Sequence, residues 1–221
     1  MPEVLVPAAR WSRWLANFEA SHGAASLSST DHGLRGTAAD GSWFSAHLPF
    51  SRPYEGPADA DAFASSASLI PTTPTTLPGR SAWGVLLVRK GGFAVARLEG
   101  PQIAESKVGQ RHVQGRTKAG GQSQQRFARR RANQARVAYE AAAEHAVRIL
   151  QDVEHVVAGG DRSAVAGVLD DARLRSLTVV GPWLAVPDPR RAVLEGAVRE
   201  AQALVVYVEN RQDRIETPSR Q

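Results

Sequence analysis

A glycine pair followed by a glutamine stands near the middle of the chain, at Gly120, Gly121 and Gln122. Glycine adopts backbone conformations closed to other residues, so a pair of glycines lets the chain bend sharply and approach a ligand closely. A glutamine amide can orient a water molecule, but it cannot act as a general base. The chemistry that these residue types favour is therefore the positioning of a reactant rather than the abstraction of a proton.

The residues around this tripeptide are strongly basic. Nine of the 27 Lys and Arg lie between Ser106 and Tyr139, a window without Asp or Glu. An arginine guanidinium is a planar fork of donors that matches a phosphate group. We expect contacts to the phosphates of a polyanionic partner from Arg116, Lys118, Arg126, Arg129, Arg130, Arg131 and Arg136. The net charge of +5 points the same way, because an ordinary turn between two elements needs no such concentration of cations.

Several other kinds of site are disfavoured. The chain has no cysteine, and its six histidines form no i, i+4 pair on a predicted helix, so we expect neither a metal site nor a cofactor. Neither a Gly-x-Ser-x-Gly elbow nor a phosphate-binding P-loop is present. No apolar run approaches 18 residues, and the residues after Met1 lack a signal-peptide pattern, so we expect a cytoplasmic protein that does not enter a membrane.

The elements that must position the glycine loop follow from the periodicity of the apolar residues. Two strands joined by a hairpin turn at Arg89–Gly92 precede it, and a third extended segment leads into it. The predicted strands are Trp83–Val88, Phe93–Arg97 and about Ile103 to Gly115. A long helix from about Ser123 to Val157 follows, because alanines and other apolar residues form one stripe along it. We expect the glycines in Ala158-Gly159-Gly160 to end this helix.

Alternating elements complete this region. The predictions are a helix at Ser163–Leu169, a strand at Leu177–Val180, a turn at Gly181-Pro182, a helix at Pro189–Ala203 and a strand at Ala203–Val208. Strands that first meander and then alternate with helices predict an α/β (α+β) fold, in which helices pack on a mixed sheet.

Residues 1–80 are expected to form a small N-terminal α+β subdomain packed on the main domain. It should contain helices at Ala8–His22 and Ala58–Ile70, short strands at Leu27–Leu34 and Trp43–Phe50, and a Pro/Ser/Thr-rich connection. The first helix carries Trp11, Trp14, Leu15 and Phe18 on one face, which is typical of a core stripe. We expect residues 81–210 to be the main domain and residues 211–221 a polar tail.

The run from Gly115 to Arg129, Gly-Arg-Thr-Lys-Ala-Gly-Gly-Gln-Ser-Gln-Gln-Arg-Phe-Ala-Arg, resembles a known catalytic loop and its following helix. It is similar to the middle domain of eukaryotic and archaeal class 1 peptide-release factors. It is closer still to the Vms-like release factors of actinobacterial type, a group of peptidyl-tRNA hydrolases. The resemblance covers about Ala82 to Asn210.

This resemblance implies an RNase H-like domain that hydrolyses the ester between a nascent peptide and its tRNA, as in ribosome rescue and ribosome-associated quality control. Its partners would be the RNA of the large ribosomal subunit and peptidyl-tRNA, and the basic side chains would bind RNA. Gln122 would donate its backbone N–H to the leaving 3′-oxygen, and its side chain would position the water. No stop-codon-reading domain is recognisable before Pro78, so codon-independent release is expected.

Alternatives remain for the catalytic glutamine and for the function of the protein. Vms-like members commonly carry Gly-x-x-Gln, which Gly121 and Gln124 also satisfy, so Gln124 is the alternative to the favoured Gln122. A non-catalytic ribosome- or RNA-binding protein that uses the basic helix is the alternative function. A nuclease is disfavoured, because the strands from Trp83 to Gly115 offer only Glu99 and Glu105 as carboxylates for metal ions.

Overall fold

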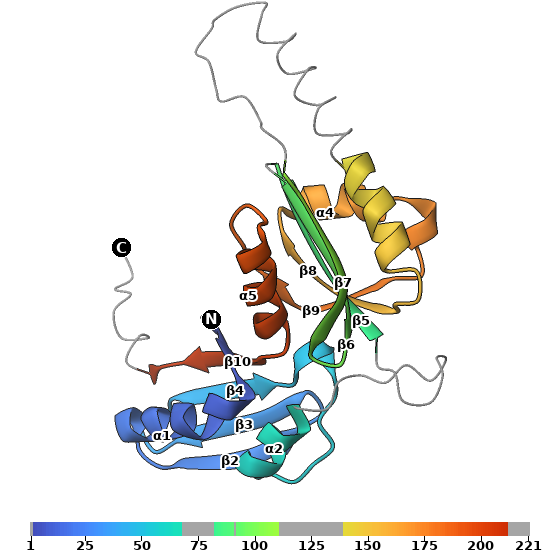
Figure 1. The fold of residues 1–221 in the computed structure, drawn as a ribbon. Coiled ribbons are helices and arrows are strands. Elements are labelled where there is room, and N and C mark those ends of the chain that lie inside the picture. The colour runs from blue at the N-terminus through green and yellow to red at the C-terminus, as the bar shows by residue number, and fades with distance from the viewer. Residues whose placement is uncertain (1, 68–81, 91, 111–138, 212–221) are drawn as a thin grey trace, which may run out of the picture. The chain divides into compact units, whose positions relative to one another are not determined.

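Two five-stranded sheets organise the chain in the computed structural model, which describes residues 2–67, 82–90, 92–110 and 139–211 (Figure 1). The chain divides into two compact units, the first made of Met1–Pro71 with Arg199–Gln221 and the second of Thr72–Val198. The expected α+β class, a mixed sheet with packed helices beside a smaller α+β part, is confirmed. Within the described ranges, no helix is long and apolar enough to cross a membrane.

The first sheet has the strand order β1-β10-β4-β3-β2 and is antiparallel throughout. Its strands are β1 (Glu3–Val6), β2 (Ala25–Thr30), β3 (Gly33–Ala38), β4 (Trp43–His47) and β10 (Leu204–Glu209). In β10, Val206 pairs with Val4 on one side and with Ala46 on the other. We expected this strand within residues 81–210; in the structure it is an interior strand of the first sheet, and its Leu204 and Val206 face the core of that unit.

Helices α1 (Trp11–His22) and α2 (Ala60–Ala67) pack into this core, and Leu48 and Tyr54 add to it. Short 3-10 turns lie at Ala8–Arg10 and Pro49–Ser51. The predicted aromatic stripe is confirmed as core, since Trp11 is fully buried and packs edge-on against Phe44 of β4 with ring centroids 5.7 Å apart. Phe18 packs on the same ring at 5.1 Å. Phe44 in turn lies over Gly36, the residue with which it pairs across β3 and β4.

The second sheet has the order β7-β6-β5-β8-β9. Its strands are β5 (Ala82–Arg89), β6 (Gly92–Glu99), β7 (Gln102–Gln110), β8 (His155–Gly160) and β9 (Thr178–Leu184). The first three form the predicted antiparallel meander, and β8 and β9 then add parallel to β5. Strand β9 continues through Gly181 and Pro182, where we expected a turn.

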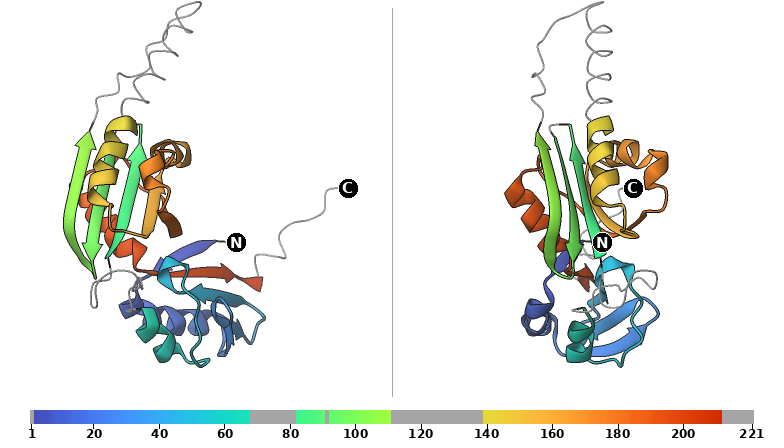
Figure 2. Two further views of the ribbon diagram at one scale, coloured as in Figure 1. Left: turned by 90° about the vertical axis from the view of Figure 1, so that its right-hand side faces the viewer. Right: turned by 45° about the vertical axis from the view of Figure 1, so that its right-hand side comes forward.

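Helices cover both faces of this sheet (Figure 2). The helical residues 139–149 and α4 (Arg162–Leu169) share one core with the first face, and α5 (Arg191–Ala201) lies along the other. A 3-10 turn at Ala172–Leu174 leads from α4 to β9.

The predicted long helix is wrong at its C-terminal end. Helical structure stops at residue 149, and His155–Gly160, assigned to the helix and its glycine cap, is strand β8. Its valines 156 and 157 and Ala158 are fully buried between β5 and β9, an environment that favours β-branched residues in an extended backbone. The glycines belong to the strand end: a Cβ on Gly159 would lie 2.6 Å from the Leu184 carbonyl oxygen.

Candidate functional site

The residues predicted for catalysis and RNA binding all lie in the segment 111–138, outside the described residues. They are Gly120, Gly121, Gln122, Gln124, Arg116, Lys118, Arg126, Arg129, Arg130, Arg131 and Arg136. What the structure describes is the frame that holds both ends of this segment: β7, which ends at Gln110, and the helical residues that begin at 139.

Strand register places the first end of the segment at a defined edge of the second sheet. Gln110 pairs with Gly92, Gly92 with Arg89, and the neighbouring Val88 with Gly160. Strands β5, β7, β8 and β9 therefore all terminate at one edge, which we call the carboxyl edge (top of the sheet in Figure 1). In sheets with parallel strands, the carboxyl ends are where ligands commonly bind.

The ring of Phe93 lies between β7, which precedes the segment 111–138, and the helix that follows the segment. Phe93 pairs with Gly109 of β7, and its ring lies so close over that glycine that an added Cβ would stand 2.3 Å from Cε1. The other side of the ring stacks on His145 of the helix, with centroids 5.5 Å apart. Because Phe93 is almost fully buried, its contacts tie β7 to the helix one residue before β7 ends.

The surroundings of His145 disfavour its protonated form. Burial lowers the pKa of this imidazole, and the positive charges of Lys107 and Arg148 lower it further. Arg148 also forms an ion pair with Glu105 of β7, a second link between the helix and the strand. The base of the segment is thus joined by one apolar and one ionic contact.

Tyr139, the first described residue after the segment, packs against α4. A Cβ on Gly167 would lie 3.2 Å from its Cδ2, so the absence of a side chain there makes room for the ring. Burial raises the pKa of the Tyr139 phenol, and the negative charge of Asp161 adds to the effect. Asp161 caps α4 through Oδ1, which accepts from the Ser163 backbone N–H at 3.0 Å and from its hydroxyl at 2.7 Å. The hydrogen bond from that hydroxyl is the main reason that the pKa of Asp161 is lowered.

Comparison with known protein families shows which family contains these residues. A model of the actinobacteria/chloroflexi VLRF1 release factor family matches residues 81–207, more than half of the chain. The chain belongs to this family. The match confirms the resemblance to Vms-like release factors, gives the chain a release-factor-like function and implies interaction with the ribosome. A search of curated proteins found no match.

The family match contains the whole segment 111–138 and both elements that hold it. The predicted catalytic and RNA-binding residues therefore fall inside the release factor region, whereas β1 to β4 and α1 and α2 precede it. It also includes most of β10, which the structure assigns to the first sheet.

The structure adds basic residues to the carboxyl edge of this release factor that sequence reasoning did not select. Arg89 ends β5, Lys90 follows it, and Arg162 begins α4 two residues after β8 ends. The acid-free window is not the sole basic signal in the sequence, because the predicted hairpin turn also carries an Arg-Lys pair. Arg162 lies more than 70 positions further along the chain, so only the pairing of β5 with β8 shows that it is a neighbour.

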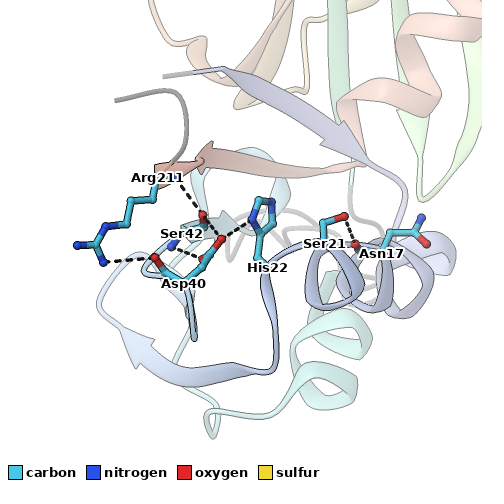
Figure 3. A network of polar contacts seen from close by, with 6 residues as sticks. All are labelled: Asn17, Ser21, His22, Asp40, Ser42 and Arg211. Carbon is cyan, nitrogen blue, oxygen red and sulfur yellow. Dashed lines mark hydrogen bonds and ion pairs between the residues drawn. The ribbon is translucent and has the colours of Figure 1, made fainter. Parts of the chain in front are cut away.

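A serine, a histidine and an aspartate also meet in the first unit, but not in a catalytic arrangement (Figure 3). Asp40 accepts from the Ser42 hydroxyl at 3.1 Å and lies 2.9 Å from His22 Nδ1, so the carboxylate stands between the other two groups. A nucleophilic serine needs its base within hydrogen-bond reach. The fully buried Ser42 instead accepts the Arg211 backbone N–H at 3.0 Å, which fastens the end of β10 to the β3–β4 turn. Among the described residues, no group of His, Cys, Asp or Glu has a metal-binding arrangement.

Proposed function

We propose that this protein is a codon-independent peptidyl-tRNA hydrolase that frees nascent chains from stalled ribosomes or large subunits. The observation that carries the proposal is the position of the Gly-Gly-Gln loop inside the matched release factor region and inside a basic window without acids. The site of action would be the cytoplasm, and the reaction requires no cofactor. We further propose that the second unit is an RNase H-like domain, which its meander followed by two parallel strands supports.

The proposed mechanism is positioning and charge stabilisation. Gly120 and Gly121 let the backbone enter a crowded RNA site, and the Gln122 N–H stabilises the charge that develops on the leaving 3′-oxygen. The Gln122 side chain holds the attacking water in line with the ester carbonyl. The arginines and Lys118 bind RNA phosphates, which gives affinity and orientation but no chemistry.

The residues on either side of the segment 111–138 support this mechanism. A catalytic group works best when the residues that carry it are held by packing on rigid elements. Phe93 fixes the end of β7 against His145, and Tyr139 fixes the returning chain against α4. Both ends of the segment are therefore held at the carboxyl edge while the residues between them reach the ribosome.

The test is the release of labelled peptide from stalled ribosome complexes by wild type, Gln122→Ala and Gln124→Ala. We expect Gln122→Ala to lose release by roughly 100-fold, because alanine keeps the backbone N–H but removes the side chain that positions the water, and misplacing a reactant by about 1 Å can cost this much. Gln125→Ala is the matched control, because it removes a neighbouring amide of the same kind, and it should release peptide like wild type.

Three results separate the possibilities. Loss in Gln124→Ala alone would make Gln124 the acting glutamine. Full activity in both variants would refute the catalytic role of the loop. Salt-sensitive ribosome binding by wild type without any release would favour the alternative, a non-catalytic ribosome- or RNA-binding protein.

A further inference from the structure

Four cationic side chains gather at the carboxyl edge of the second sheet, outside the segment 111–138. Arg89 ends β5 and Lys90 follows it, Arg162 begins α4, and Arg190 immediately precedes α5; all four are exposed. The Asp161 backbone N–H donates to the Val88 carbonyl at 2.8 Å, which brings the start of α4 beside Arg89. The positive charge of Lys90 lowers the pKa of Asp161, the residue before Arg162, so Lys90 also lies near the start of α4. We call these four residues the edge cluster.

The Arg89 side chain is oriented by two residues that follow β9. Its Nη1 donates to the Val186 carbonyl at 2.7 Å, and its Nε lies 3.8 Å from the Asp188 carboxylate. A guanidinium has five N–H donors, so these contacts orient the group and leave donors for a ligand. The same contacts bring residues 186–188, and with them the neighbouring Arg190, to the carboxyl edge.

Arg162 is oriented by an aromatic ring. Its guanidinium carbon lies 4.2 Å from the ring centroid of Trp183 of β9, a cation–π contact. Stacking uses the flat face of the guanidinium, whereas its N–H donors lie in the plane and remain directed outward. A planar cation held in this way is suited to an oxyanion such as phosphate.

Two carboxylates, Asp161 and Asp188, lie among these cations and offset part of their positive charge. Asp161 Oδ1 accepts two hydrogen bonds from Ser163 as the cap of α4. Asp188 stands 3.8 Å from Arg89, beyond the distance of a charge-assisted hydrogen bond, and both side chains are about half exposed. With Glu140, which follows Tyr139, three carboxylates stand near this edge, and the four cations still outnumber them.

We propose that the edge cluster binds phosphates of ribosomal RNA of the large subunit, as a second anchor beside the catalytic segment. This inference rests on the proposed function, because a segment that enters the large subunit brings its own base against RNA. The recognised chemistry is the phosphate backbone, which determines affinity and register but not sequence. The cluster stands on rigid elements, so it fixes the angle at which the segment enters.

The test is the binding of the full-length chain to empty large ribosomal subunits over a range of salt concentrations. The variant is Lys90→Gln with Arg162→Gln, which removes two cations and leaves Arg89 and its carbonyl contact intact. Each lost phosphate contact reduces the slope of log affinity against log salt by about 0.7 to 0.9. For two contacts, raising the salt from about 50 to about 200 mM should weaken wild type by roughly 7- to 12-fold more than the variant.

Arg175→Gln is the matched control, because Arg175 is an exposed arginine of the same unit, just before β9, at the opposite end of the sheet. We expect it to bind with the wild-type affinity and salt slope. Circular dichroism and thermal unfolding of each variant establish that it is folded.

A wild-type slope in the double variant would overturn the inference, and so would an equal change in the control. A defect seen only on subunits that carry peptidyl-tRNA would assign the cluster to tRNA and would also overturn it. Peptide release by wild type is measured alongside, on large subunits that carry labelled peptidyl-tRNA. Binding that depends on the edge cluster without release would overturn the proposed function alone, and release without this dependence would overturn the inference alone.

Discussion

Replacing Gly109 with alanine tests whether the Phe93 ring is packed tightly against β7 next to the segment 111–138. In the structure, a Cβ at this position would lie 2.3 Å from Cε1 and 2.6 Å from Cζ of Phe93. Phe93 is 9% exposed and is held on its other side by His145, so its ring has little room to move away. We therefore expect the substitution to push the ring against the helix.

The expected magnitude follows from two opposing effects. Forcing an extra methyl group into a packed core costs about 1–3 kcal/mol. Alanine instead of glycine at a compatible backbone position stabilises by about 0.4–1 kcal/mol, because the unfolded chain has fewer conformations. The free energy of unfolding of the second unit should thus fall by about 1–2 kcal/mol.

Denaturant unfolding of four proteins measures this effect: wild type, Gly109→Ala, Phe93→Leu and the double variant. The shorter leucine makes room for the alanine methyl group, so the double variant should be more stable than the sum of the single effects by about 1 kcal/mol. The matched control is Gly167→Ala on α4, whose Cβ would approach Tyr139 only to 3.2 Å. Its helix preference is worth about 1 kcal/mol, so this variant should be neutral or more stable.

Additive effects in the cycle would refute this tight packing, since independent sites do not interact. A Gly109→Ala protein as stable as wild type would show that the ring moves freely. The link between β7 and the helix would then depend on the ion pair of Arg148 and Glu105.

Two further predictions concern charged groups. Hydrogen bonds from the Arg173 side chain and backbone lower the pKa of Asp171 to about 2, so Arg173→Gln should return it toward 3.8, as measured by NMR titration; an unchanged value would contradict the assigned cause. The backbone N–H of Ser42 and the side chain of His22 lower the pKa of Asp40 below 3.8. A carboxyl group with a lowered folded pKa stabilises fully above its unfolded value and loses this contribution as pH falls through the folded pKa. The stability advantage of wild type over Asp40→Asn should therefore be full at about pH 6 and shrink below about pH 4, as measured by denaturant unfolding, and a constant difference would contradict the role of the carboxylate.

Local patterns predicted most of the elements, because their signals lie within a few residues. The meander of β5, β6 and β7 follows from an apolar run, a turn with glycines and a second apolar run, and the core stripe of α1 follows from its spacing. Strand β8 was missed because its valines and alanine continue the apolar stripe of the preceding helix. What makes this stretch extended is its position between β5 and β9, which no local pattern contains.

Some residues of the candidate site are close together in sequence, and others are brought together only by the fold. The glycine-glutamine loop and its arginines are adjacent in sequence, so residue types alone indicated their chemistry. The edge cluster combines positions 89, 90, 162 and 190, and the Phe93 contact combines residues of β6, β7 and a helix. Such groups become neighbours only through strand register, which depends on the whole sheet.

Strand β10 has a consequence for the order in which the protein can fold. It separates β1 from β4, so β1 has no neighbour in the first sheet until β10 is in place. A ribosome that synthesises this chain makes β1 to β4 early and β10 after the entire second sheet. The meander of the second unit, with its short-range contacts, can form while the N-terminal sheet is still incomplete. A truncation before Leu204 should leave the second sheet with all of its strands and leave the N-terminal sheet open at β4, an exposed edge that invites aggregation.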